Sequence, residues 1–174
     1  MAKALQLPAD LLIVRKIQLP DNPEAGFGAV GPDGEMILNE LWVAQLHLAE
    51  YEIIAQKKKT IDSIKKRDQI FRKGRPYPDL KGKTVILVDD GLASGYTMLA
   101  AIGFTQTLEP SKIIAAVPTA SNKTVDFVLP HVDELVCLNV RRGYYFAVAD
   151  AYENWYDLGD DEVLSIIKRE PFIY

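Results

Sequence analysis

The sequence predicts an α/β protein: a single-domain parallel twisted sheet with helices on both faces, plus a small β-hairpin wing, within residues 1–174. Three observations carry this prediction. Short apolar runs alternate with helical patterns in the second half of the chain, as consecutive βαβ units require. The run 85–88 (VILV) has no polar alternation, which is typical of a strand buried on both faces of a parallel sheet. A length of 174 residues also suffices for one substantial core.

The first predicted elements are a short helix and a strand. Residues 1–7 have a helical pattern that ends at Pro8, and residues 11–14 (LLIV) predict a buried strand. Arg15 and Lys16 follow, at the strand end where open α/β sheets bind ligands. These two cations are either ligands for a diphosphate group or a solvated basic strand end.

A β-hairpin is predicted next along the chain. The runs 27–30 and 36–38 flank the turn sequence GPDG at residues 31–34. We expect this hairpin to pack as a wing on the edge of the sheet.

Residues 46–72 predict one long helix, because apolar residues recur at spacings that fit a single face. Nine of the 20 basic residues lie between Lys57 and Arg75, and a solvated helix face is the simpler interpretation for most of them. Residues 73–81 (KGRPYPDLK) contain a glycine and two prolines, which predicts a mobile loop.

The centre of the sequence is the run 84–97, TVILVDDGLASGYT. Its strand is followed by Asp89 and Asp90, then by small residues that allow a tight turn, and then by a helix that continues to about residue 108. Free N–H groups and the hydroxyls of Ser94 and Thr97 at the helix start suit a phosphate. The paired carboxylates would repel that phosphate, but they suit the vicinal hydroxyls of a sugar. The run therefore predicts a ribose 5-phosphate site, and the alternative is an ordinary turn whose acids are solvated or bind a metal alone.

The remaining elements complete a β-α-β-α-β order. Residues 113–117 predict a strand, residues 118–121 its terminal loop, and Ser121 caps a helix that Pro130 ends. Residues 134–140 predict the third strand, and Asp160 begins the last helix. Aromatic residues are dense from 144 to 156, where hydrophobic packing is the simpler interpretation.

The composition argues against several classes of protein. The net charge of −4 speaks against general nucleic-acid binding, which usually goes with a positive surplus. No apolar run approaches the ~20 residues that span a bilayer, so we expect no membrane partner. The single cysteine, Cys137, cannot form an internal disulfide, which fits a cytoplasmic protein.

The segment 85–97, VILVDDGLASGYT, resembles the 13-residue phosphoribosyl-pyrophosphate (PRPP) motif of the type I phosphoribosyltransferases. The resemblance assigns Asp89 and Asp90 to the ribose hydroxyls. Residues 14–16 (VRK) are similar to a strand end of adenine- and orotate-type members, which implies that Arg15 and Lys16 join the two aspartates as catalytic residues. The loop that the resemblance assigns to the 5-phosphate consists of Gly91, Ala93, Ser94, Gly95, Tyr96 and Thr97.

The resemblance implies a transferase that moves the 5-phosphoribosyl group between PRPP and a nitrogenous acceptor, expected to be a nucleobase, with release of pyrophosphate. Such enzymes act in nucleotide metabolism and in purine or pyrimidine salvage, and a homodimer is their usual form. Mg²⁺ would arrive on the substrate, so no dedicated metal ligands are expected. Family members also imply a flexible loop, with Arg72, Lys73 and Arg75 as candidates, and base-facing residues, with Phe146 and Asp150 as candidates.

One departure from the family pattern concerns the N-terminus. Family members usually begin with a further strand and a short turn whose backbone binds the diphosphate. This sequence starts at Met1 in what resembles the helix after that turn. Either the sequence is a fragment, its start was placed late, or the protein lacks the turn, and in that last case a weaker pyrophosphate site is expected. The alternative function is a non-catalytic sensor that binds PRPP or a nucleotide on the same fold, and a third is an inactive structural partner.

Overall fold

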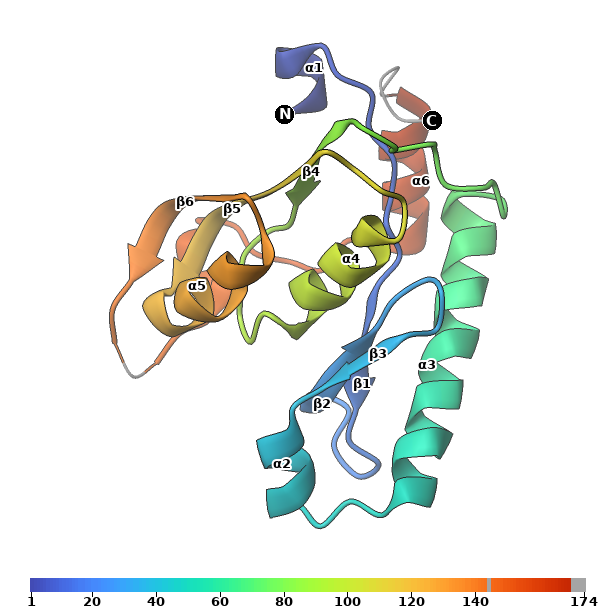
Figure 1. Ribbon diagram of the computed structural model, residues 1–174, viewed down its shortest axis with the longest axis vertical. Helices are drawn as coiled ribbons and strands as arrows, with labels where there is room; N and C mark the ends of the chain where they lie inside the picture. The colour runs from blue at the N-terminus through green and yellow to red at the C-terminus, as the bar shows by residue number, and fades with distance from the viewer. Residues whose placement is uncertain (144, 170–174) are drawn as a thin grey trace.

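The structure, a computed structural model, describes residues 1–143 and 145–169 (Figure 1). Helices and strands alternate along most of it, and two short 3-10 helices, η1 and η2, precede and follow the last strand. The elements in chain order are α1 (Ala2–Leu5), β1 (Arg15–Gln18), β2 (Gly26–Val30), β3 (Met36–Leu38), α2 (Glu40–Gln45), α3 (Glu50–Phe71), β4 (Thr84–Val88), α4 (Tyr96–Gln106), β5 (Lys112–Ser121), α5 (Asn122–Val128), η1 (Leu129–His131), β6 (Glu134–Arg141), η2 (Val148–Ala151) and α6 (Asp160–Arg169).

Strands β4, β5 and β6 form a parallel sheet in that order, which confirms the three strands predicted for the second half of the chain. The α/β class, with a parallel sheet flanked by helices and a separate hairpin, is confirmed as well. The terminal loop predicted for residues 118–121 is wrong. Strand β5 continues to Ser121 because Thr119 and Ser121 still pair with Asn139 and Arg141 of β6, beyond Pro118.

Helices α4 and α5 cover one face of this sheet. Leu87, Ala115 and Val117 on that face share a core cluster with Ile102 of α4 and Val128 of α5. Burial of both faces of the strand at 85–88 was the sequence-based prediction, and it is wrong. Strand β4 is the edge strand of the described sheet, and its last residue, Val88, is 56% exposed.

The predicted hairpin is confirmed, and it belongs to a second sheet. Strands β1, β2 and β3 form this antiparallel sheet, in which Arg15 pairs with Val30 of β2. The strand predicted for residues 11–14 is wrong, because those residues lie outside both sheets and the ladder begins at Arg15. Arg15 and Lys16 therefore begin an antiparallel strand and do not end a parallel one.

The long helix predicted for residues 46–72 is shorter at its start than expected. Helix α2 ends at Gln45, His47 adopts a left-handed backbone with φ of 50°, and α3 begins at Glu50. The side chain of Glu52 accepts a hydrogen bond from the N–H of Ala49 at 2.9 Å, which fixes the new helix start.

Helix α4 lies between the two sheets (Figure 1). It contacts β4 on one side and all three hairpin strands on the other. Helices α3 and α6 pack on the hairpin sheet in a second core cluster, and α6 begins at Asp160 as predicted. None of the described helices combines the length and apolar character needed to cross a bilayer. The arrangement brings the start of α4, the end of β4 and the hairpin to one place.

Candidate functional site

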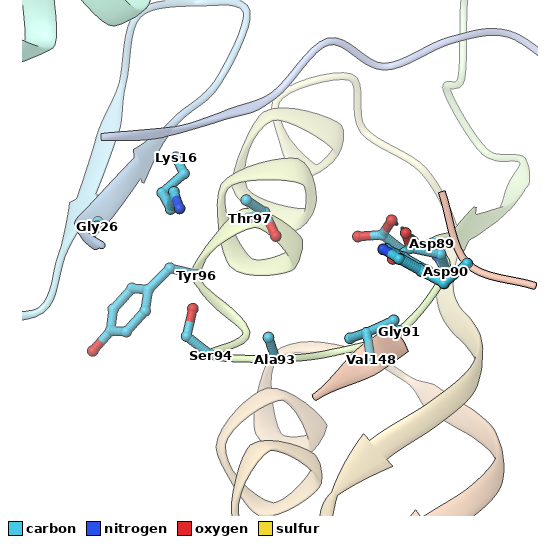
Figure 2. Close-up of a pocket in the computed structure, with 12 residues that line it drawn as sticks. Lys16, Gly26, Asp89, Asp90, Gly91, Ala93, Ser94, Tyr96, Thr97 and Val148 are labelled. Atoms are coloured by element: carbon cyan, nitrogen blue, oxygen red, sulfur yellow. Dashed lines mark hydrogen bonds between the residues drawn. The ribbon is translucent and has the colours of Figure 1, made fainter. Parts of the chain in front are cut away.

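A cavity of about 300 Å³ lies where β4 ends and α4 begins. Figure 2 shows Asp89 and Asp90 on one side of the start of α4 and Lys16 on the other, with Ser94 and Thr97 between them. The residues that line the cavity are Lys16, Gly26, Gly28, Asp89, Asp90, Gly91, Ala93, Ser94, Tyr96, Thr97, Val148 and Trp155.

The two carboxylates at the end of β4 both have a raised proton affinity. Burial of its carboxyl, followed by the charge of Asp90, raises the pKa of Asp89 to about 6, and the N–H of Asp90 opposes this by donating to Asp89 Oδ1 at 3.0 Å. Burial is also the main cause that raises the pKa of Asp90, and the charge of Asp157 adds to it. Two ionised neighbours of this kind gain from ligand groups that donate hydrogen bonds, such as sugar hydroxyls.

The start of α4 borders the cavity, where Ser94, Tyr96 and Thr97 line it. No described side chain caps this helix, and the first N–H groups of any α-helix have no acceptor within it. In the loop before the helix, the carbonyl of Ala93 accepts a hydrogen bond from Thr124 Oγ1 at 2.7 Å. Amides, hydroxyls and the positive end of the helix dipole together suit an anion.

Gly95 lies in this loop, on the side that packs against α5, and it does not line the cavity. Its φ of 86° is the left-handed conformation that glycine adopts without strain. A Cβ at this position would also lie 3.0 Å from carbon atoms of Thr124 and Val128. The glycine therefore allows the loop to turn into α4 while it packs closely on α5.

Lys16 and Arg15 point in opposite directions because they are neighbours on one strand. Lys16 lines the cavity and donates to the carbonyl of Glu24. Arg15 faces α3, where burial and then the charge of Arg67 lower its pKa against the attraction of Asp160. The structure thus brings Lys16 to the site and places Arg15 outside it.

Residues 40–151 match the family model of the phosphoribosyl transferase domain. The chain belongs to the phosphoribosyl transferase family. It is 37% identical over 169 residues to two curated proteins of Mycobacterium tuberculosis, "Putative phosphoribosyl transferase Rv0571c" of strain H37Rv and MT0597 of strain CDC 1551. The match covers 97% of this chain but 38% of each relative, so this phosphoribosyl transferase domain spans well under half of their length.

A solved structure shares the fold of this phosphoribosyl transferase domain. The crystal structure of TT1426 from Thermus thermophilus superposes with a TM-score of 0.71 at 33% sequence identity. The superposition covers 95% of this chain and 77% of that one.

The three loop candidates lie away from the cavity of this phosphoribosyl transferase domain. Arg72 is 1% exposed and forms ion pairs with Asp10 and Asp68, so the flexible-loop role predicted for it does not fit its burial. Arg75 donates to the carbonyl of Arg72 and lies 3.8 Å from Asp10. Lys73 is exposed in the irregular segment that follows α3, and its role over the site stays a prediction.

The two base-facing candidates contact Arg141 and do not line the cavity. The guanidinium of Arg141 lies 5.7 Å from the ring centroid of Phe146 and 3.6 Å from a carboxylate oxygen of Asp150. Val148 and Trp155 from the same segment take the cavity positions. Aromatic density in the sequence pointed to this segment, but no sequence signal distinguished Trp155 from its neighbours or selected Val148.

Glycines of the hairpin form another part of the cavity that sequence reasoning missed. Gly26 and Gly28 of β2 line it with bare backbone. A Cβ on Gly26 would collide with the side chain of Lys16. The absence of a side chain at Gly26 therefore allows Lys16 to lie beside the cavity. The signal was the repeated glycine in the GFG run, which the hairpin prediction did not use.

The raised pKa of Asp89 predicts that this carboxylate destabilises the free protein at neutral pH. The folded state holds the proton of Asp89 up to about pH 6, whereas the unfolded state releases it near pH 3.8. The contribution to the free energy of unfolding therefore falls as pH rises between these values and stays low above them. D89N removes this loss, so its Tm should exceed that of the wild type at pH 7.5. We expect a gain of only about 2 °C, because the side chain of Asp89 is partly exposed and water screens its charge.

Thermal unfolding of both proteins at pH 4.5 and pH 7.5 tests this prediction. The advantage of D89N should shrink at the lower pH, where Asp89 is protonated in the folded wild type. An equal difference at both values would contradict a raised pKa.

Proposed function

We propose that this phosphoribosyl transferase domain binds PRPP and transfers its 5-phosphoribosyl group to a nitrogenous acceptor, expected to be a nucleobase, with release of pyrophosphate. The observation that carries the proposal is the meeting of Asp89 and Asp90 with the uncapped start of α4 in one cavity. A ribose 5-phosphate carries both kinds of group that this arrangement suits, because it has vicinal hydroxyls at one end and a dianion at the other.

Each side of the cavity has a role in this proposal. The carboxylates of Asp89 and Asp90 accept hydrogen bonds from the ribose hydroxyls, and their negative charge favours the positive charge that develops on the ribose ring. The amides of the α4 start and the hydroxyls of Ser94 and Thr97 hold the 5-phosphate. Lys16, which lines the far side of the cavity, is the proposed partner of the leaving diphosphate (Figure 2).

The reaction requires the protein to position the substrates, and it requires no covalent intermediate with the protein. The bond between ribose C1 and the diphosphate oxygen breaks, and the diphosphate leaves with the electron pair. The lone pair of the acceptor nitrogen forms the new bond to C1, and the proton of that nitrogen passes to the diphosphate or to water. Holding the sugar at two ends supplies the orientation that such a displacement requires. Mg²⁺ bound to the diphosphate would neutralise its charge, and the carboxylate oxygens of Asp89 and Asp90 are donors of the kind that this ion prefers.

A PRPP or nucleotide sensor is the second candidate function. One observation favours it: Lys16 is the one lysine or arginine that lines the cavity within residues 1–143 and 145–169. A single cation binds a diphosphate weakly and does little to stabilise it as a leaving group. The protein would then bind a sugar phosphate without catalysing the transfer.

Pyrophosphate release distinguishes the two functions. The protein is incubated with PRPP, Mg²⁺ and a panel of nucleobases and small amines, and ribose 5-phosphate binding is measured in parallel by calorimetry. Release with a particular acceptor supports the transferase. Ribose 5-phosphate binding without release across the panel supports the sensor, and absence of ribose 5-phosphate binding would overturn both.

A further inference from the structure

A tyrosine in the segment after β6 forms a hydrogen bond with the backbone of the acid pair. Tyr152 Oη donates a hydrogen bond of 2.7 Å to the carbonyl of Asp90, 62 positions earlier in the chain. The ring of Tyr152 packs on that of Trp155 with centroids 5.1 Å apart, and Trp155 lines the cavity. Asp90, Tyr152 and Trp155 thus connect the part of the cavity at the acid pair, where the ribose is proposed to bind, with the aromatic side of the cavity, which Trp155 lines.

A second contact lies one residue further along the same loop. A Cβ on Gly91 would lie 2.8 Å from Val148 Cγ1, so only a glycine lets η2 approach the loop this closely. Val148 also lines the cavity. Segment 148–155 therefore rests on Asp90 and Gly91 at two adjacent points.

The backbone of Asp90 is held on both sides. Its N–H donates to Asp89 Oδ1 at 3.0 Å, and its carbonyl accepts from Tyr152. Ribose hydroxyls that donate to Asp89 would compete with the first of these bonds, because both use the same carboxylate. A shift of the Asp89 carboxylate would then move the backbone of Asp90, because the peptide units that flank Asp90 are planar and stiff. The carbonyl of Asp90 would pass this movement to Tyr152.

We propose that Tyr152 is a positioning residue that couples occupancy of the acid pair to the placement of Trp155 on the aromatic side of the cavity. This inference rests on the proposed ribose-phosphate function. A tyrosine hydroxyl is protonated at neutral pH and can donate. Burial, followed by the charges of Asp90 and Asp89, raises the pKa of Tyr152 further in the same direction. As a consequence, binding of a sugar phosphate would position Trp155 on the side of the cavity where the acceptor binds.

The chain supplies its own reporter and its own control. It has two tryptophans, Trp42 in α2 and Trp155, so W42F leaves Trp155 as the one fluorophore of this kind. Tyr156 lies four residues after Tyr152, but its hydroxyl donates to Glu162 Oε1 at 2.9 Å. Y152F and Y156F each remove one hydroxyl and keep the ring, and only the first cuts the connection to Asp90.

The experiment titrates ribose 5-phosphate into W42F, W42F/Y152F and W42F/Y156F, and follows Trp155 emission together with calorimetric affinity. W42F and W42F/Y156F should show the same change in emission on binding. W42F/Y152F should bind within about threefold of the same affinity but lose at least half of the emission change. With an acceptor that turns over, Y152F should raise the KM for the acceptor about tenfold and leave the KM for PRPP nearly unchanged.

The outcomes separate this inference from the function on which it rests. Ribose 5-phosphate binding with a full emission change in W42F/Y152F would overturn the coupling alone. An absence of binding in W42F itself would overturn the proposed function and the coupling with it. Equal losses in the Y152F and Y156F variants would show that the segment has merely loosened, which also defeats a specific role for Tyr152.

Discussion

Replacement of both site aspartates, D89N/D90N, should weaken ribose 5-phosphate binding about 100-fold or more while the fold stays intact. Each carboxylate offers a charged acceptor to a sugar hydroxyl, and a hydrogen bond to a charged group contributes about 1.5–3 kcal/mol. An asparagine keeps the shape but offers one neutral acceptor and a competing donor. Removal of two negative charges near a phosphate would by itself strengthen binding, so the direction of the effect separates a sugar-binding role from simple electrostatics.

Calorimetry with ribose 5-phosphate measures this effect, and circular dichroism checks the fold. D126N is the matched control, because Asp126 is an exposed acid on α5 that lies outside the cavity. The control should bind like the wild type. Unchanged or tighter binding by D89N/D90N would refute the assignment of the two carboxylates to the ribose.

The second large effect is expected at Arg72, outside the cavity. R72M should lower the free energy of unfolding by about 3–5 kcal/mol, because it removes the buried cation that pairs with Asp10 and Asp68. The guanidinium donates to Asp10 at 2.7 Å, to Asp68 at 2.9 Å and to the carbonyl of Arg75 at 2.8 Å. It also lies 3.7 Å from the ring centroid of Tyr77.

Urea unfolding of R72M beside R142M provides the measurement. Arg142 is exposed, so its replacement should change stability by less than about 0.5 kcal/mol. The triple variant R72M/D10N/D68N should regain part of the loss, since the acids that R72M strands are then neutral. A loss for R72M as small as that for R142M would mean that the buried cluster contributes little.

The two largest effects differ in how far the sequence could foresee them. The acid pair and the helix start lie within one run of 13 residues, and contiguous residues keep their spacing in any fold that forms the strand and the helix. Arg72 depends on Asp10, which is 62 positions away. A cluster of basic residues looks the same in sequence whether its members are mobile or buried against a distant acid.

The choice between Arg15 and Lys16 shows a second limit of sequence reasoning. Apolar residues at 11–14 predicted a parallel strand that would carry both cations to its end. Pairing with β2 instead begins the strand at Arg15, and alternation then sends Lys16 to the cavity and Arg15 to α3. Strand pairing is a long-range property, so local pattern could name the two cations but could not choose between them.

The places of Trp155 and Val148 in the cavity could not be predicted from the sequence, because they too depend on long-range contacts. Their segment meets the loop at Asp90 and Gly91 through contacts between residues far apart in the chain. The sequence indicated an aromatic-rich region, and the structure selected which members of it face the cavity.

The hydroxyl of Thr124 has a consequence for how this protein can vary. It donates to the carbonyl of Ala93, and it also lies 2.8 Å from the hydroxyl of Ser121, which caps α5 by accepting from the N–H of Thr124. The loop that contains Ala93 is therefore held in place by a helix that does not line the cavity. A substitution in α5 that removes this hydroxyl should therefore loosen the loop that we propose binds the 5-phosphate. The loop and α5 would have to change together for that binding to be kept.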